Sequence, residues 1–503
     1  MNQLRIGIVL NYLNIILHIL IVIFYTPYML RMMGQSEFGL YSLVASIIAY
    51  LTLLDFGISN GVIRYTAKLR AEGETTKQYE MFGMFISIYC LLSFVVILVG
   101  AFFIIKADDI FSQSMTLDEI YKMKIMLIIL LFNLAFTLPM SVFSGIITAY
   151  EDFIFVRLLT FLRIVFTTIL MIILLEMGYK AIAMVVVNTI FNFLFLLTNY
   201  IYVKYKYKIQ IIYFRFKREF IGEFAIYSFW IFLNAIMDKV YWTTGQFVIG
   251  VYVSTSAVAI YMLSIHLQSA YMQFSTAISS LFLPKITTIA TKQGSKIEIS
   301  NMFLKVSRVQ YIILGVIFWV FLSVGKEFIQ LWLGKDYDNV YYISAMFLGA
   351  LVIPLTQNIG IVILQARNQM KFRSLLCVSI AIICLIFQIV LTKFYGIYGS
   401  VFPVVIMLII GQGLILNIYY KKVQHIDIGA YWKSFMRLSI VPLLLCILCI
   451  YVKSMLAINS WVVLFAYCTS FLFLYYIISY LISFNSYEKS LIRQFISKIR
   501  FSR

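Results

Sequence analysis

The chain has 503 residues, of which 63% are hydrophobic and only 12% are charged. Soluble domains carry about 25% charged residues, so this composition cannot supply a water-exposed surface. The net charge of +19 would suit nucleic acid, but no aromatic-rich basic module stands apart from the apolar runs, and we expect no nucleic-acid partner. Composition therefore predicts an all-α, polytopic membrane protein that is covered by lipid.

Apolar runs recur along the whole chain, and a helix needs about 20 such residues to span the hydrocarbon. We expect about fourteen transmembrane helices. They are predicted at 8–31, 36–59, 81–105, 122–146, 154–176, 180–203, 224–250, 255–283, 309–333, 341–365, 374–395, 397–420, 434–456 and 459–483. The second and eighth of these runs are the least apolar. No cleavable signal peptide is expected, because the first run is long and a second span follows it.

The distribution of the 40 lysines and arginines predicts the orientation, because these residues gather in cytoplasmic loops. With the N-terminus inside, the inside loops at 64–77, 204–218 and 285–308 are rich in them, whereas the outside loops hold few. We therefore expect a multi-pass protein of the inner (plasma) membrane with both termini in the cytoplasm. This bias and attraction to anionic lipid account for the net charge.

The chain shows no sign of soluble chemistry. Its polar stretches are too short to build a core, and no Walker-type phosphate-binding motif is present. All six cysteines lie in predicted spans, and the C-x-x-C at Cys446 and Cys449 lies mid-helix, where packing explains it better than metal or redox chemistry. Asp108 and Asp109 fit a solvated acidic loop. We expect no enzyme activity, no cofactor and no metal site.

A faint internal repeat appears when the sequence is shifted by 220 residues. Gly39, Leu40 and Tyr41 then fall on 259–261, and the first two spans fall on spans seven and eight. Transporters are often built from such repeats. We predict an N-terminal six-helix lobe at 1–215, a second at 216–425, and two extra helices with a cytoplasmic tail at 426–503.

Polar side chains inside the spans are the candidate site residues, because a polar group that faces lipid costs several kcal/mol. Asn14 and His18 share a helical face, and a second stripe on span seven repeats every four residues. The candidates for a substrate-binding cavity are Asn14, His18, Arg163, Asn234, Asp238, Lys239, Trp242 and Gln273. The alternative for these groups is an interhelical hydrogen bond.

Arg163 is the strongest of these candidates, because an arginine cannot lose its charge and must face water, an acid or an anionic ligand. His18, Asp238 and His266 are candidates for coupling to an ion or proton. The alternatives are a satisfied structural histidine at position 18, and an Asp238 that only neutralises Arg163 or Lys239.

A charged pair closes the second span near the cytoplasm, where the sequence reads D-F-G-I-S-N-G-V-I-R at 55–64. Asp55 and Arg64 are nine residues apart, about two and a half turns of a continuous helix. An Asp55–Arg64 latch at a cytoplasmic gate is one interpretation. An ordinary helix end with an inside arginine is the other.

The opening stretch carries M-G-Q-S-E-F-G-L-Y-S at 33–42 and L-L-D-F-G-I-S-N-G-V-I-R-Y at 53–65. It resembles the bacterial polysaccharide flippases (Wzx-type O-antigen exporters) of the multidrug/oligosaccharidyl-lipid/polysaccharide exporter superfamily. The resemblance covers the whole chain in span number and length, and it is specific over about residues 8–70. It implies a fold like that of the multidrug exporters, with two six-helix lobes around a central cavity.

The resemblance also implies a function and a substrate. Such flippases carry an oligosaccharide repeat unit, linked through pyrophosphate to undecaprenol, across the inner membrane for O-antigen or capsule synthesis, and the glycan polymerase machinery would be a further partner. Basic and polar residues line their cavities; Arg163, Lys239, Asp238, Asp55 and Arg64 are of the matching types. The alternatives are a cation-coupled drug or small-molecule exporter of the same fold, and a membrane glycan polymerase or ligase.

Overall fold

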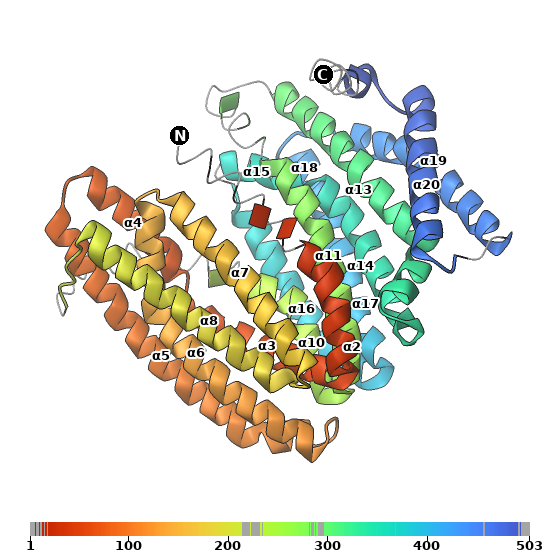
Figure 1. The fold of residues 1–503 in the computed structure, drawn as a ribbon. Helices are drawn as coiled ribbons and strands as arrows, with labels where there is room; N and C mark the ends of the chain where they lie inside the picture. Colours follow the sequence, from red (N-terminus) through yellow and green to blue (C-terminus); the bar gives the residue numbers. More distant parts are fainter. Residues whose placement is uncertain are drawn as a thin grey trace, which may run out of the picture. The chain divides into compact units, whose positions relative to one another are not determined.

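The computed structural model of the chain contains helices and no strand in the part that it describes (Figure 1). It describes residues 6, 10, 13, 14, 16, 17, 19–213, 222, 232, 233, 235–280, 282, 286, 288, 289, 296–367, 369–455, 458–490 and 493.

Eleven helical segments in these residues are long and apolar enough to cross a membrane, and Ile21–Met33 forms a shorter apolar helix. The eleven are Gln35–Ala71, Thr75–Phe111, Leu117–Ala149, Phe153–Glu176, Ala181–Tyr207, Lys296–Trp332, Lys335–Ala366, Lys371–Tyr395, Ile397–Lys422, Ile428–Met455 and Trp461–Ile482. Each coincides with a predicted run. The predicted run at 255–283 also forms a helix, α11 (Thr255–Ser280). The expectation of a polytopic all-α membrane protein is confirmed.

The helices gather into two compact units, Met1–Met262 with Leu385–Ser400, and Leu263–Cys384 with Val401–Arg503. We call them the first and second units. The first unit contains α2 (Thr26–Met33), α3 (Gln35–Leu51), α4 (Ile58–Ala71), α5 (Thr75–Phe111), α6 (Leu117–Ala149), α7 (Phe153–Glu176), α8 (Ala181–Tyr202) and α10 (Thr244–Tyr252). The second contains α13 (Lys296–Trp332), α14 (Asp338–Thr356), α15 (Asn358–Ala366), α18 (Leu416–Lys422), α19 (Ile428–Met455) and α20 (Trp461–Ile482). The helices α11, α16 (Lys371–Tyr395) and α17 (Ile397–Leu408) each contribute residues to both units. The three-part division at 215 and 425 stays a prediction.

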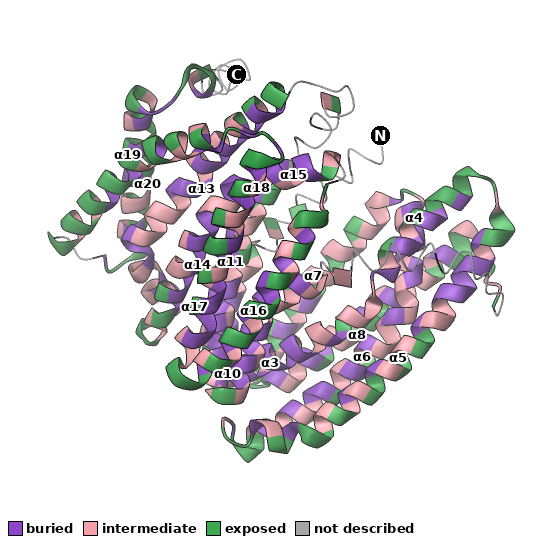
Figure 2. Ribbon diagram, turned by 180° about the vertical axis from the view of Figure 1, so that it is seen from behind, coloured by how far each residue is buried: buried purple, intermediate pink, exposed green. Residues whose placement is uncertain are grey.

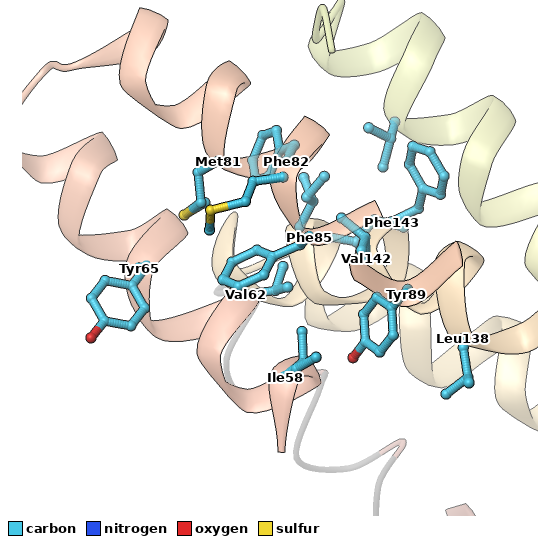
Figure 3. Close-up of a cluster of buried hydrophobic side chains, with 14 of the residues drawn as sticks. Ile58, Val62, Tyr65, Met81, Phe82, Phe85, Tyr89, Leu138, Val142 and Phe143 are labelled. Atoms are coloured by element: carbon cyan, nitrogen blue, oxygen red, sulfur yellow. The ribbon is translucent and has the colours of Figure 1, made fainter. Parts of the chain in front are cut away.

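An apolar cluster between α4, α5 and α6 forms a core of the first unit (Figure 3). Val62, Phe85 and Val142 are completely buried in it, one from each helix. Because lipid is as apolar as these side chains, close packing rather than a hydrophobic driving force holds the helices together. Both α5 and α6 are about 50 Å long, which exceeds the hydrocarbon thickness of about 30 Å, so their ends project beyond it.

The outer faces of the helices carry large apolar side chains, as expected for contact with lipid. On α5, Leu98, Phe102 and Ile105 are exposed, and Val96 on the opposite side of the helix is completely buried. Figure 2 shows this mixture of buried and exposed residues along α5.

The second predicted span is interrupted near its end. A short 3₁₀ turn, Thr52–Asp55, follows α3, and α4 begins at Ile58. Phe56 and Gly57 between them have φ angles of 49° and 75°, in the left-handed region that glycine adopts without steric cost. The D-F-G sequence therefore ends one helix and starts another.

A polar cluster joins α3, α6 and α11 in the first unit. The Glu119 carboxylate accepts hydrogen bonds from the hydroxyls of Ser36 (2.5 Å) and Thr255 (2.7 Å), and these two hydroxyl oxygens are 3.1 Å apart. Gln35 Nε2 donates to the carbonyl of Ser256 over 3.0 Å. We call these five residues the Glu119 clasp. It satisfies a partly buried carboxylate and fixes the start of α3 against the start of α11.

The contacts in the Glu119 clasp follow the 220-residue shift of the predicted repeat. Under that shift Gln35 corresponds to Thr255 and Ser36 to Ser256. Gln35 contacts Ser256, and Ser36 contacts Thr255, so each contact has a reciprocal counterpart. Copies related by a two-fold axis make contacts of this kind. The pattern favours the internal repeat, which stays a prediction.

In the second unit, a buried ion pair fixes the segment that follows α20. Arg308 on α13 donates from Nε (2.5 Å) and Nη2 (2.9 Å) to the two carboxylate oxygens of Glu488. The two side chains are only 12% and 3% exposed. Arg308 Nη2 also donates to the carbonyl of Ser483 over 3.1 Å. A bidentate pair with a further carbonyl compensates the desolvation of both charges.

A close backbone approach between α3 and α11, beside the Glu119 clasp, predicts a strong effect of one methyl group. A Cβ atom added at Gly39 would lie 1.8 Å from the carbonyl oxygen of Thr255, so Gly39→Ala must push α3 and α11 apart. Overpacking of this kind costs about 1–3 kcal/mol or more. We expect a clearly lower unfolding temperature of the purified protein in detergent.

The matched control is Gly413→Ala, where an added Cβ would meet no atom within 4 Å. It should unfold at the wild-type temperature. Equal unfolding temperatures for the two variants would contradict the close packing at Gly39.

Candidate functional site

Two interrupted helices lie side by side in the first unit. One is the α3–α4 segment with its break at residues 52–57, and the other is the helix at 235–242, which breaks at Thr243 before α10 begins. The hydroxyls of Tyr50 and Thr244 are hydrogen-bonded to each other, and the rings of Phe56 and Phe232 lie 4.7 Å apart. Because residue 50 pairs with 244 and residue 56 pairs with 232, the two segments are antiparallel. We call this region the interrupted pair.

At the second break one backbone carbonyl keeps its helical hydrogen bond and gains a side-chain contact. The carbonyl of Lys239 accepts from the backbone N–H of Thr243 (2.8 Å) and from the hydroxyl of Thr244 (3.5 Å). Irregular backbone at membrane depth occurs where protein or a water-filled cavity surrounds it, and discontinuous helices mark the binding sites of many transporters. The interrupted pair is therefore a candidate functional site on the basis of its backbone alone.

Three predicted site residues lie together on the second segment of the interrupted pair. Asp238 is exposed, and Lys239 and Trp242 are half-buried. The Trp242 ring lies 6.1 Å from that of Tyr241. A carboxylate, an ammonium group and an indole within one turn of a broken helix can bind a ligand that carries both charge and sugar-like faces.

Of the two predicted gate residues, Asp55 lies at the first break and Arg64 on α4, and they do not form an ion pair with each other. Asp55 accepts hydrogen bonds from the hydroxyls of Ser59 (3.0 Å) and Tyr89. Arg64 is exposed, and its guanidinium carbon lies 5.9 Å from the centre of the Tyr65 ring. The expected Asp55–Arg64 latch assumed a continuous helix, whereas the left-handed Phe56 and Gly57 redirect the chain between the two residues. A gating role for either residue stays a prediction.

Arg163 lies on α7 and is half-buried. Its guanidinium carbon is 5.2 Å from the centre of the Phe195 ring on α8. No carboxylate of the described residues pairs with it. A cation–π contact is worth about 0.5–2 kcal/mol, well below the cost of holding an uncompensated charge in the membrane. Arg163 is thus a half-buried cation in a predicted span with no carboxylate partner among the described residues.

The remaining predicted residues have mixed outcomes. Asn14 is buried and its Nδ2 donates to the carbonyl of Arg157 on α7 over 3.1 Å. His266 and Gln273 are half-buried on α11 in the second unit. His18 and Asn234 lie outside the described residues.

The sequence analysis did not single out several polar groups of the first unit by residue. Asn192 on α8 donates to Asn133 (2.6 Å) and Thr137 (2.7 Å) on α6, and Asn188 donates to Tyr41 over 3.0 Å. These are interhelical hydrogen bonds, the structural role that polar residues in spans often have. The four-residue spacing of Asn188 and Asn192 could have indicated this face. No such signal pointed to Tyr50 and Thr244, since hydroxyl residues are common in apolar helices.

No group of three or more histidine, cysteine or acidic side chains that could hold a metal occurs in the part of the chain that the structure describes. The cysteines in that part are free, and Cys446 is buried in the apolar packing between α13, α19 and α20.

The fold is shared with membrane exporters and flippases of known structure. The lipid II flippase MurJ, in an inward closed conformation, superimposes with a TM-score of 0.72 at 15% identity, over 97% of this chain and 99% of that chain. A multidrug resistance MATE family transporter of the MOP superfamily, in an inward-facing conformation, gives 0.58 at 12% identity, over 82% of this chain and 99% of that chain. At these identities the likeness concerns the fold, and it defines the class: a polytopic membrane protein with the architecture of this transporter superfamily.

The family follows from the sequence. The profile of the polysaccharide biosynthesis protein family matches residues 5–291, more than half of the chain. The chain belongs to this family, which confirms the resemblance drawn from the motifs at 33–42 and 53–65. The uncharacterized membrane protein EpsK of Bacillus subtilis strain 168 is 19% identical over 496 residues, 96% of each chain.

The charge at Asp238 provides a test of the interrupted pair. Asp238→Asn keeps the shape of the side chain and removes its charge beside Lys239, so we expect surface polysaccharide to fall at least about tenfold, the effect of losing one charged hydrogen bond. Polysaccharide would be measured in a deletion strain that carries the variant at wild-type protein level.

Cys446→Ala is the control, because it removes a small, 2% exposed side chain outside the candidate site. Negligible effects of both substitutions would mean that this stretch of the interrupted pair serves packing only.

Proposed function

We propose that the chain is a flippase that moves oligosaccharide repeat units, linked through pyrophosphate to undecaprenol, across the inner membrane for surface polysaccharide synthesis. Membership of the polysaccharide biosynthesis protein family supports a role in polysaccharide synthesis. The shared fold with a lipid II flippase supports transport of a lipid-linked glycan. The main support for an anionic substrate is Arg163. It is a half-buried cation whose described contact is an aromatic ring.

The physical problem for such a flippase is to carry two phosphates and a sugar through hydrocarbon. Unassisted, these groups would lose their hydration at a cost of many kcal/mol. A guanidinium group can replace water around a pyrophosphate with paired, charge-assisted hydrogen bonds. Arg163 supplies that group on α7, and the Phe195 ring beneath it holds it in place without neutralising it.

The other candidate residues fit the remaining parts of the substrate. Trp242 offers an aromatic face on which a sugar can stack, and Lys239 offers a second positive charge. The undecaprenyl chain can remain in lipid, since it needs no protein to shield it. The inner-membrane location and the cytoplasmic termini proposed here rest on the distribution of lysine and arginine.

Transport would proceed by alternating access, in which contacts on one side of the membrane break while others form. The Glu119 clasp is the contact we propose to open during the cycle. On the proposed division of the chain at 215, it joins the N-terminal and C-terminal six-helix lobes through Ser36 and Thr255. Hydroxyl–carboxylate bonds can be exchanged for water at little net cost, unlike tight apolar packing.

Removal of the guanidinium group tests the anion site. Arg163→Ala should lower glycan export at least about tenfold, because one charge-assisted hydrogen bond is worth about 1.5–3 kcal/mol. Lipid-linked repeat units should accumulate in the cytoplasmic leaflet, as shown by their resistance to a periplasmic glycosidase in spheroplasts.

Arg157→Ala is a matched control on the same helix, since this arginine is exposed and its described contact is made by the backbone carbonyl. It should export normally. Normal export by well-expressed Arg163→Ala would refute the anion site. Accumulation in the outer leaflet would instead favour a polymerase or ligase, and drug sensitivity without glycan loss would favour a drug exporter.

A disulfide across the Glu119 clasp tests alternating access. The hydroxyls of Ser36 and Thr255 are 3.1 Å apart, so thiols at these positions come into contact, and Ser36→Cys with Thr255→Cys should form a bond under oxidising conditions. The locked protein should lose export, and reduction should restore it. Export would be followed with and without reductant, in a background that lacks the native cysteines.

The control pair is Asn133→Cys with Asn192→Cys, because these side chains bond within the α6–α8 bundle, which should move as one body. Its oxidation should leave export unchanged. If the oxidised clasp still exports at the wild-type rate, the clasp does not open during transport.

A further inference from the structure

An apolar cavity of about 410 Å³ lies in the first unit among α3, α5, α10 and α16. Its walls include Ile47, Phe103, Val248, Val251, Leu385 and Ile389. Two of its polar wall residues, Tyr50 and Thr244, bond to each other through their hydroxyls. The space therefore offers an occupant almost nothing but hydrocarbon contacts.

The cavity borders the lipid-facing surface of the unit. On α5, Phe102 is 59% exposed beside the wall residue Phe103, and on α16, Ile386 and Val390 are 56% and 46% exposed around the wall residue Ile389. Exposed apolar side chains in a membrane protein are covered by acyl chains. The molecules that can reach this cavity are consequently membrane lipids.

The depth of the cavity matches one leaflet. Along α10 it extends from Thr244 to Tyr252, nine residues whose end-to-end rise is about 12 Å at 1.5 Å per residue. The hydrocarbon core of a bilayer is about 30 Å thick, so this is close to half of it. Tyr252 is the last residue of α10 and Lys393 lies in the last turn of α16, so this end of the cavity lies at the level of the headgroups.

A positive charge marks that end. Leu385, Ile389 and Lys393 are spaced four apart, so they share one face of α16, and Lys393 continues the apolar wall outward. The Lys393 ammonium nitrogen lies 4.8 Å from the centre of the Tyr252 ring. The side chain is exposed and forms no ion pair with any described residue. A lysine at the interface attracts anionic lipid headgroups.

We propose that this cavity is a lipid-binding site that takes one acyl chain of an anionic phospholipid, with the headgroup phosphate on Lys393. The volume is near the lower end of the range for ligand pockets, about 300–1,000 Å³, which suits a single acyl chain and not the long polyprenyl chain of the proposed substrate. On the predicted orientation the site faces the outer leaflet. The bound chain would lie against Tyr50 and Thr244 and thus brace the interrupted pair.

Photo-crosslinking in nanodiscs tests this site. The full-length protein is placed in phosphatidylcholine discs that contain a trace of phosphatidylglycerol or phosphatidylcholine with a diazirine in mid-chain, and adducts are mapped by peptide mass spectrometry. We expect adducts on the wall residues of α10 and α16, stronger with the phosphatidylglycerol probe. Lys393→Gln should reduce that preference about fivefold, the effect of one interfacial lysine.

Variants that fill the cavity distinguish probe bound inside it from probe that only touches the lipid-facing surface. Val248→Trp should abolish the wall adducts, and Val251→Phe provides a milder filling if the larger residue disturbs folding. Val463→Trp, in a second apolar cavity between α19 and α20, should leave the wall adducts unchanged. Only variants that unfold at the same temperature as the wild-type protein are compared.

Three results would overturn the proposal. The first is wall labelling that resists filling of the cavity. The second is equal labelling by the two probes that does not change with Lys393→Gln. The third is displacement of the phosphatidylglycerol probe by stoichiometric undecaprenyl phosphate but not by excess phosphatidylglycerol, which would assign the cavity to the polyprenyl chain.

Discussion

The hydrogen-bonding demand of the backbone in hydrocarbon governs this structure. A helix satisfies its own N–H and C=O groups, so every interruption inside a span leaves groups that protein must satisfy, because lipid cannot. At the break before α10, the Thr244 hydroxyl lies near the carbonyl of Lys239 and also bonds Tyr50 on the neighbouring interrupted segment. The Tyr50–Thr244 bond thus joins the hydroxyl groups of the two segments, while the backbone at the break is satisfied within its own segment.

The same demand applies to charge, and the chain meets it in two ways. Asp152, buried at the turn between α6 and α7, is surrounded by Lys206 and by the hydroxyls of Tyr202 and Tyr207, so its charge is locally neutralised. Within the described part of the chain, the contact of the Arg163 guanidinium is the Phe195 ring. A membrane protein retains such an incompletely compensated cation when it serves function, and this contrast separates a structural charge from a candidate binding charge.

The sequence predicted the spans well, because twenty consecutive apolar residues are readable without knowledge of packing. It also singled out Arg163 by its charge, and the stripe with Asp238 by its four-residue spacing. It did not predict where a helix breaks or which side chains from distant parts of the chain bond to each other. The turn at Phe56 and Gly57 ends one helix and starts another between Asp55 and Arg64, and the Tyr50–Thr244 bond joins residues 194 positions apart, which no local pattern encodes. The acyl-chain cavity likewise arises from four helices that meet only in the folded chain.

The ion pair between Arg308 and Glu488 bears on how the C-terminus can be engineered. A chain cut before residue 488 would leave the Arg308 guanidinium, 12% exposed, without its carboxylate, and an orphaned buried charge costs about 3–5 kcal/mol. Affinity tags and fluorescent reporters therefore belong after Glu488, with the preceding stretch left intact. Loss of protein in shortened variants would then report a broken anchor on α13 rather than a transport defect.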